Sequence, residues 1–356
     1  MSNKKIVLHK RPAEGIDPSL TSGTFRLRTV PRPDNKNVPA DKVLVRVHYL
    51  SLDPTMRGWL SARRSYIAPV EVGAVMRGPS MAQVISVGSN LAAQFQAGDW
   101  VYTWAGWQEY AALGVKELEK IPIPPGGRPT DVLSTLGVTG LTAYFGLIDV
   151  GQPREEDTVV VSGAAGATGM IAGQIAKIKG AKRVIGLAGS KDKCDFLVKE
   201  LGFDVAINYK DADWRNQLKA ATPDFIDIYF DNVGGDILDM CLTRAARNSR
   251  FVMCGAISQY NSTKPNGPAN YMNIISQRIT MKGFIVFDYA KQYQQAREEL
   301  SAWLAQGKLI RKDHIVPGGL EAAPRSLVDL FAGANTGKMM VEVAPASEAL
   351  APKAKL

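Results

Sequence analysis

The sequence contains few of the side chains that bind metal ions or form disulfides. Three cysteines and three histidines occur among 356 residues. The cysteines, Cys194, Cys241 and Cys254, are too few and too odd in number for a disulfide framework, which indicates a reducing compartment. A zinc site needs cysteine, histidine and carboxylate ligands from several segments. No such set is visible, so we expect no metal.

Long apolar runs are also missing. Residues 1–12 contain no apolar core of signal-peptide length, and no run elsewhere is long enough to span a bilayer. No serine in a nucleophile elbow has a suitable histidine partner, which argues against a hydrolase.

The formal net charge is +9. Because the basic residues are scattered, a solvated basic surface is a better interpretation than nucleic-acid binding.

The last three residues form a short targeting pattern. Ala354-Lys355-Leu356 is a conservative variant of the Ser-Lys-Leu peroxisomal address. Residues 344–356 consist mostly of Ala, Pro, Ser and Lys, which predicts a flexible tail that would present this address to the import receptor. Cytoplasmic and peroxisomal locations both stay open.

The rhythm of apolar residues changes near position 130. Residues 1–130 read mostly as strands separated by turns and end in a Pro/Gly-rich stretch that predicts a domain boundary. In residues 131–310, apolar runs alternate with helical stretches, which predicts an α/β domain with a parallel sheet covered on both faces. Residues 311–343 look strand-like again, and we expect them to return to the first domain.

A glycine-rich turn follows the apolar run 158–162. Gly163, Gly166 and Gly169 are spaced Gly-x-x-Gly-x-x-Gly and lead into a helical stretch. Small residues let the backbone approach a pyrophosphate, and a helix N-terminus offers N–H donors and the positive end of a dipole. Glycine also serves tight packing in such turns. The strand before the turn and the helix after it favour a dinucleotide site.

The next predicted strand, 183–187, ends without an acidic residue. Enzymes that use NAD place a carboxylate there to bind the ribose hydroxyls. Here Gly189, Ser190 and Lys193 follow the strand instead. Lys193 and Ser190 would bind a 2′-phosphate that a carboxylate would repel. These side chains could also be plain helix surface, but we favour NADPH as the cofactor.

With these features the sequence resembles the zinc-independent medium-chain dehydrogenases/reductases of the leukotriene hydroxydehydrogenase, prostaglandin reductase and alkenal double-bond reductase type. The resemblance extends from Val43 to Val343. The matching stretches are Ser51–Gly58, Gly106–Tyr110, Leu141–Gly146, Ala164–Gly169, Ile207–Lys210, Tyr229–Gly235, Cys254–Asn261 and Gly333–Lys338. The resemblance implies a Rossmann doubly wound parallel sheet in residues 131–310 and a GroES-like β-rich substrate-binding domain in residues 1–130.

The resemblance also implies which residues hold NADPH. Lys193 and Tyr209 would bind the 2′-phosphate, Asn232 would lie near the ribose, and Asn335 would bond the cofactor from the returning segment. The full set of candidate cofactor residues is Thr142, Gly166, Ala167, Thr168, Gly169, Gly189, Ser190, Lys193, Tyr209, Asn232, Cys254, Gly255, Ala256, Ile257, Ser258, Phe284, Ile285, Val286 and Asn335.

The chemistry that the resemblance implies is 1,4-reduction of an α,β-unsaturated aldehyde or ketone. Hydride passes to the β-carbon, and Tyr260 would stabilise the enolate, although it could also be a structural loop tyrosine. Thr55, Tyr66 and Trp104 are the candidate substrate residues. Thr55 stands where the family usually has tyrosine, which would widen or depolarise one wall of the substrate site. We expect Asp53 and Arg57, which flank Thr55, to pin this loop to the strand before it.

Two other functions stay open. The chain could be a quinone reductase of the related zinc-free branch, or a catalytically inactive protein that keeps the cofactor fold. Members of the family are often dimers formed through the nucleotide domain. The apolar run Phe284–Phe287, at the end of a predicted strand at 282–286, is a suitable edge for a homodimer.

Overall fold

The computed structural model describes residues 2–350, so Ala354-Lys355-Leu356 lies outside the described residues. The described chain divides into two compact units. Unit 1 comprises residues 2–123, 127–133 and 313–350, and unit 2 comprises residues 124–126 and 134–312. Among residues 2–350, no helix is both long and apolar enough to cross a lipid bilayer.

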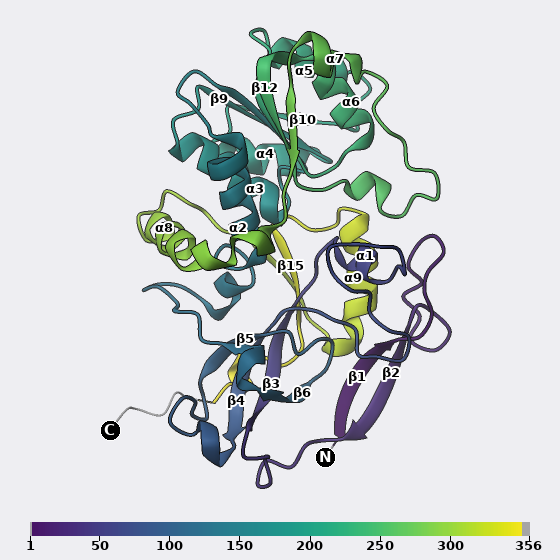
Figure 1. Ribbon diagram of the computed structural model, residues 1–356, viewed down its shortest axis with the longest axis vertical. Coiled ribbons are helices and arrows are strands. Elements are labelled where there is room, and N and C mark those ends of the chain that lie inside the picture. The colour runs from purple at the N-terminus through teal and green to yellow at the C-terminus, as the bar shows by residue number, and fades with distance from the viewer. Residues whose placement is uncertain (1, 351–356) are drawn as a thin grey trace. The chain divides into compact units, whose positions relative to one another are not determined.

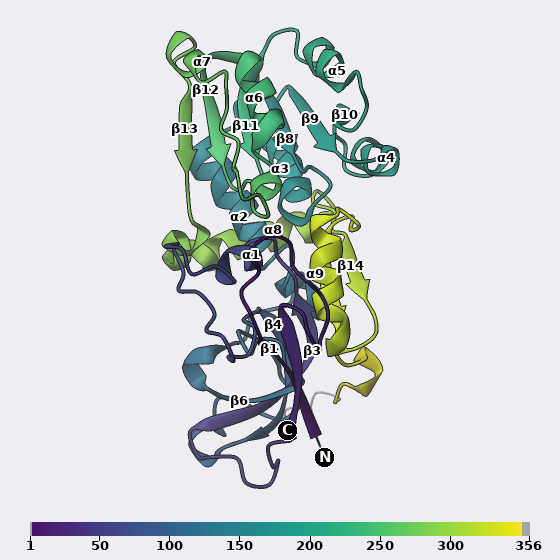
Figure 2. The same cartoon turned by 90° about the vertical axis from the view of Figure 1, so that its right-hand side faces the viewer.

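Unit 2 contains a six-stranded parallel sheet of strand order β10-β9-β8-β11-β12-β13, and Figure 2 shows this order from β13 at the left to β10 at the right. Its strands are β8 (Thr158–Ser162), β9 (Arg183–Ala188), β10 (Val205–Asn208), β11 (Ile226–Asp231), β12 (Ala245–Met253) and β13 (Thr280–Gly283). Its helices are α2 (Val138–Phe145), α3 (Ala167–Ile178), α4 (Lys191–Lys199), α5 (Trp214–Ala221), α6 (Gly235–Thr243), α7 (Met272–Ser276) and α8 (Tyr293–Ala305). This is the doubly wound Rossmann order.

Two layers of helices cover the sheet of unit 2. Alternate residues of β8 show how the strand serves both layers: Val159 and Val161 pack with α2, α3 and α8, whereas Val160 packs with α5 and α6. Successive side chains of a strand point to opposite faces. The continuous apolar run of β8 is therefore what a strand buried on both faces requires, and the predicted α/β class is confirmed.

Unit 1 is mainly β-structure. Its strands are β1 (Ser2–Leu8), β2 (Phe25–Pro31), β3 (Lys42–Ser51), β4 (Ser80–Val87), β5 (Trp100–Thr103), β6 (Tyr110–Gly114), β7 (Leu118–Glu119), β14 (Asp313–Val316) and β15 (Lys338–Glu342). Its helices are α1 (Met56–Trp59) and α9 (Ala323–Phe331). Strands β1 and β2 pair with each other, and Figure 1 shows them as a separate purple ribbon.

Strand β3 organises the larger sheet of unit 1. One of its edges pairs with β4, and the other is shared by β6 along residues 42–46 and by β15 along residues 49–51. Irregularities in the β3–β4 register accompany this change of partner. Strand bulges increase twist and bend a sheet. β15, which lies near the end of the chain, thus pairs with β3, which begins at residue 42.

Residues 344–350 are held by hydrogen bonds within unit 1. The Ala344 carbonyl lies 3.2 Å from Nδ1 of the buried His48. The Gln83 side chain bonds both the N–H and the carbonyl of Leu350, at 2.6 and 2.7 Å. Arg46 and Glu348 also form an ion pair. The predicted tail is therefore attached to β3 and β4 as far as residue 350.

Two elements differ from the sequence prediction. The strand predicted at 282–286 is β13, which ends at Gly283, and a 3-10 helix begins at Val286. The strand-like reading of residues 311–343 missed α9, in which Ala323, Leu327 and Leu330 are buried. Spacings of four and three residues are the helical period, and short apolar runs do not separate this period from a strand.

The packing of α3 against the segment after α4 yields a stability test. A Cβ on Gly173 would lie 1.9 Å from the Phe203 ring. Gly173→Ala should therefore destabilise the protein by about 1–3 kcal/mol through overpacking, measured by urea unfolding. The matched control is Gly58→Ala in α1, where a Cβ meets nothing within 4 Å. A Gly173→Ala variant as stable as the wild type would contradict this packing.

Candidate functional site

Most of the predicted cofactor residues of unit 2 follow the carboxyl ends of its parallel strands. They stand in five segments directly after β8, β9, β10, β11 and β12 and in a sixth beyond β13. Carboxyl ends of parallel strands meet at one edge of a sheet. The strand order reverses between β8 and β11, and ligands of such sheets bind in the crevice at this reversal. The structure therefore gathers these residues at one edge of unit 2.

The glycine turn after β8 has the geometry of a backbone anion site. Gly163 has φ = +58°, a conformation that favours glycine. A Cβ on Gly169 would lie 2.4 Å from the Gly163 carbonyl oxygen, so the first turn of α3 rests directly on this loop. Gly166 caps the helix. The amides of Ala167 and Thr168 in its first turn precede the point where intrahelical bonds begin, so they can bind an anion.

The ends of β9 and β10 bring basic and hydroxyl groups together. Ser190 caps α4 and accepts a hydrogen bond from the Lys193 amide at 3.3 Å. The Tyr209 hydroxyl lies against Gly189, where a Cβ would be 2.7 Å away. The pKa of Lys193 is lowered by burial and by the charge of Lys210. Two lysines whose positive charges repel each other, next to a phenol and a helix N-terminus, can bind an anion.

Asp231, which sequence reasoning missed, organises the strand ends around Asn232. Its buried Oδ1 accepts hydrogen bonds from Ser162, Tyr229, Val233 and Gly234 at 2.8 to 3.1 Å. Burial raises the pKa of Asp231. The Asn232 side chain donates to the Ser162 carbonyl at 2.8 Å and joins β11 to β8. The only signal in the sequence was a carboxylate at the last position of β11, a strand that also contains Asp227.

The loop after β12 is attached to the same strand ends and carries Tyr260. The amides of Cys254 and Gly255 donate to the Asp231 carbonyl at 3.0 and 2.9 Å. The half-buried Tyr260 accepts a hydrogen bond at its phenol oxygen from the Ala256 amide, at 3.1 Å. This contact fixes the position of the phenol oxygen. A phenol that accepts one hydrogen bond can still donate its own hydrogen.

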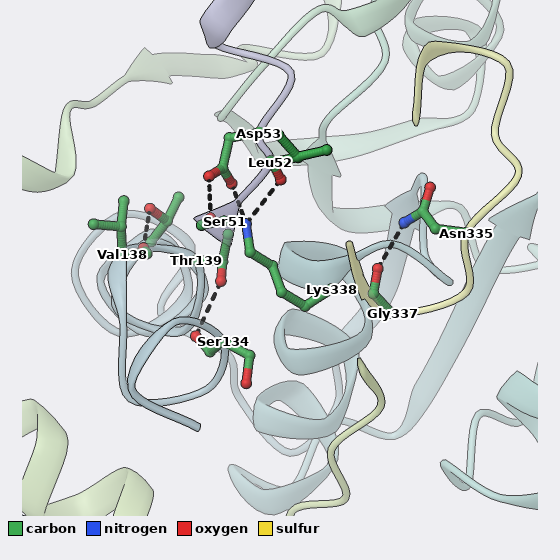
Figure 3. Close-up of polar contacts among 10 residues, drawn as sticks. Ser51, Leu52, Asp53, Ser134, Val138, Thr139, Asn335, Gly337 and Lys338 are labelled. Carbon is green, nitrogen blue, oxygen red and sulfur yellow. Dashed lines mark hydrogen bonds and ion pairs between the residues drawn. The ribbon is translucent and has the colours of Figure 1, made fainter. Parts of the chain in front are cut away.

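The remaining predicted residues of unit 2 lie near α2. The Thr142 hydroxyl donates to the Val138 carbonyl one turn earlier in the helix, at 2.7 Å. Figure 3 shows Val138 and Thr139 on this helix. Phe284 and Ile285 follow β13 and are half-buried. A Cβ on Gly146, at the end of α2, would lie 2.8 Å from the Phe284 ring, so this ring packs against that helix end.

The predicted substrate residues all belong to unit 1. Thr55 precedes α1, and its hydroxyl is 2.5 Å from the hydroxyl of the exposed Tyr66. The half-buried Trp104 packs against Trp59 and Tyr102, with ring centroids 5.9 and 6.5 Å apart. Thr55 and Tyr66 thus offer hydroxyl groups, and Trp104 offers an aromatic surface.

Asn335 also belongs to unit 1, in the turn before β15. It is buried, and its side-chain amide donates to the Gly337 carbonyl at 2.7 Å. Three residues later, Lys338 pairs with Asp53 at 2.5 Å. Arg57, which was expected to pin the loop with Asp53, donates to the carbonyls of Pro12 and Glu14. Sequence reasoning missed Lys338, because nothing in the local pattern marks it as buried.

Two family models match the chain. One describes the N-terminal domain of oxidoreductases and matches residues 4–121, and the other describes zinc-binding dehydrogenases and matches residues 167–303. Within residues 2–350, no three His, Cys, Asp or Glu side chains come together as a metal-ion site.

The chain is similar over nearly its whole length to two reductases. It is 38% identical to the NADPH-dependent curcumin reductase of Escherichia coli (strain K12), covering 96% of this chain and 97% of that protein. It is also 38% identical to the NADP(+)-dependent 2-alkenal reductase of Nicotiana tabacum, covering 96% of this chain and 98% of that protein.

A solved structure, CurA from Vibrio vulnificus in complex with NADPH, superposes with a TM-score of 0.85 at 40% identity. The match covers 96% of this chain and 99% of that one. The Rossmann sheet of unit 2, the β-rich unit 1 and these relatives all indicate the same family. The chain belongs to the zinc-independent medium-chain dehydrogenase/reductase family, the group that includes curcumin reductase and 2-alkenal reductase.

Proposed function

We propose that unit 2 binds NADPH along the carboxyl edge of its sheet. The glycine turn after β8 fits a pyrophosphate, because Gly166 and the first amides of α3 leave the backbone accessible. Ser190, Lys193 and Tyr209, with Lys210 beside them, fit a 2′-phosphate. The positive charge at the adenosine end of the site would bind the 2′-phosphate, which NADPH carries and NADH lacks.

The proposed reaction is reduction of the C=C bond of an α,β-unsaturated aldehyde or ketone. When bound, NADPH would supply the hydride for the β-carbon of the substrate, and the α-carbon of the resulting enolate would take up a proton from water. The reaction places negative charge on the carbonyl oxygen, and Tyr260 donates a hydrogen bond to that oxygen. We assign Thr55, Tyr66 and Trp104 to substrate binding, with hydroxyl groups for polar atoms and an indole for apolar chains.

The hydrogen bond from the Ala256 amide to the Tyr260 phenol is the observation that carries this proposal. An amide that donates to a phenol oxygen stabilises negative charge there, so it makes the phenol a better hydrogen-bond donor. The same loop is attached to the Asp231 carbonyl, which fixes the phenol relative to the cofactor edge. The names of the curcumin and 2-alkenal reductases point to the same class of substrate.

A substrate screen tests this function. NADPH oxidation is followed with 2-alkenals, aryl enones, cyclic enones and quinones at equal concentrations. We expect turnover with enals and enones and little with quinones. Turnover with quinones alone would contradict this proposal and identify the chain as a quinone reductase. NADPH binding without turnover of any substrate would identify it as a catalytically inactive cofactor-binding protein.

The 2′-phosphate assignment predicts a cofactor-specific defect. Lys193→Ala should raise the KM for NADPH by about tenfold, because a charge-assisted contact is lost, and leave the KM for NADH nearly unchanged. Lys191→Ala is the matched control, since Lys191 stands on the same helix, is exposed and pairs with Asp195. Equal changes for both cofactors in Lys193→Ala would refute the assignment.

The role of Tyr260 predicts a loss of turnover without a loss of cofactor. Tyr260→Phe should lower kcat by about a hundredfold while the NADPH dissociation constant, measured by fluorescence, stays close to the wild-type value. Tyr271→Phe, an exposed position of the same unit, serves as the control. Wild-type kcat in Tyr260→Phe would remove the proposed role.

We also propose that the β13 edge of unit 2 pairs with a second copy of the chain. β13 is the last strand of its sheet, and Thr280, Lys282 and Gly283 are exposed. Neighbouring α7 exposes Met272 and Ile275, at 58% and 68% of their surface. An open strand edge beside exposed apolar groups favours pairing with another chain.

The peroxisomal address at residues 354–356 stays a prediction.

The dimer is tested by light scattering at micromolar concentration. We expect twice the chain mass for the wild type and a shift toward the monomer for Ile275→Glu, which places a charge among the apolar groups. Val72→Glu, an exposed apolar position of unit 1, should remain dimeric. A monomeric wild type would contradict the proposal.

A further inference from the structure

A buried lysine begins β15 in unit 1. Lys338 is 1% exposed. Its Nζ donates to the Leu52 carbonyl at 3.0 Å and to Oδ1 of Asp53 at 2.5 Å. The other carboxylate oxygen of Asp53 accepts a hydrogen bond from the Ser51 hydroxyl at 2.6 Å. Figure 3 shows the lysine reaching the segment that follows β3, where these groups converge.

These contacts hold the segment that carries Thr55. The Asp53 carbonyl accepts the Met56 amide at 3.0 Å, so the position of Asp53 sets the start of α1. Thr55 lies between these two residues, and its hydroxyl reaches Tyr66 at 2.5 Å. Lys338 therefore fixes, through Asp53, the backbone that presents one of the proposed substrate residues.

The same lysine ends the turn that carries Asn335. This turn has left-handed glycines on both sides, Gly333 with φ = +72° and Gly337 with φ = +77°. Glycines of this kind leave a turn with many accessible conformations in the absence of other restraints. The Asn335 amide closes the turn onto the Gly337 carbonyl, and the next residue is Lys338, anchored on Asp53.

A buried ion pair adds little stability, but its strict geometry can select one arrangement of the chain. Desolvation offsets most of its attraction, and apolar residues of the same size often stabilise a fold more. The ladder between β15 and β3 contains three residue pairs, from Met340–Ser51 to Glu342–Tyr49. Slippage by one residue would turn every side chain of a strand to the other face. A buried charge whose partners meet it at one register disfavours such slippage.

We propose that Lys338 is a positioning residue, which through Asp53 sets the segments of Thr55 and Asn335 in place for substrate and cofactor. The inference rests on the proposed function, which assigns Thr55 to the enone, and on the family resemblance, which implies that Asn335 bonds NADPH. The contacts themselves, which we call the Lys338 clamp (Lys338, Asp53 and Ser51), do not depend on it. The clamp and its consequence for binding are therefore tested separately.

Hydrogen exchange tests the clamp without any assumption about function. Lys338→Met keeps an unbranched side chain and removes the charge. We expect faster amide exchange in the peptides that cover residues 52–58 and 333–338 and unchanged exchange in β8 of unit 2. The control is Lys4→Met, which breaks the 2.5 Å Lys4–Glu321 pair of the same unit. Unchanged exchange in both peptides of folded Lys338→Met would overturn the clamp.

Kinetics test the consequence for binding. A residue that only stabilises the fold lowers the active fraction, which reduces apparent kcat and leaves KM unchanged. A positioning residue changes binding in the folded enzyme. Lys338→Met should raise the KM for an enone such as 4-phenyl-3-buten-2-one, and the dissociation constant of NADPH, by about tenfold, with a smaller effect on kcat per folded molecule.

A double-mutant cycle shows whether Lys338 and Asp53 act as one device. The enone KM of Lys338→Met with Asp53→Asn should be no higher than that of the more impaired single variant, because each change removes the same contact. If the two effects multiply, or if folded Lys338→Met keeps wild-type KM and NADPH affinity, the positioning role is wrong. A wild type without enone turnover would overturn the proposed function and this role, while hydrogen exchange would still decide the clamp.

Discussion

The six parallel strands of unit 2 have their carboxyl ends at one edge of the sheet. The loops that follow these ends can contact a common ligand only if the strand ends keep their positions relative to one another. Asp231 provides much of that restraint. Its side chain accepts four hydrogen bonds, and its carbonyl accepts the amides of Cys254 and Gly255. One residue thus ties the ends of β8, β11 and β12 together. The positions of Asn232 and of the Tyr260 loop both depend on it.

Two lysines at this edge lie close enough for the charge of one to act on the other. Lys193 is half-buried beside Lys210, and burial and this neighbouring charge lower its pKa. Such a pair is unfavourable alone, and a bound phosphate relieves the repulsion. No acidic residue stands at positions 188–190, where β9 ends, and a carboxylate there would neutralise the lysines. The proposed preference for NADPH follows from this local electrostatic arrangement.

The sequence predicted features whose cause is local. The glycine turn and the strand and helix around it are encoded within about twenty consecutive residues, because backbone conformation and hydrophobic period act over short distances. The α/β class followed from the same periodicity. The places of Tyr209 and Asn335 came from family resemblance, since neither residue type indicates a cofactor site by itself. The structure brings Tyr209 next to Gly189.

Contacts between distant segments could not be predicted in this way. Lys338 and Asp53 are 285 positions apart, and Asn232 and Ser162 are 70 apart. A lysine in a sequence is normally expected at the surface, so only the paired β3 and β15 reveal why Lys338 is buried. The attachment of residues 344–350 was missed for the same reason, because a composition rich in Ala and Pro does not show which strand the segment meets.

Hydride transfer to a carbon–carbon double bond is the central claim, and isotope position tests it most directly. The enzyme is given a 2-alkenal and NADPH that carries deuterium at C4 on both faces, and the product is examined by NMR. The account predicts a saturated aldehyde with one deuterium on its β-carbon. An allylic alcohol with deuterium on the former carbonyl carbon would contradict it.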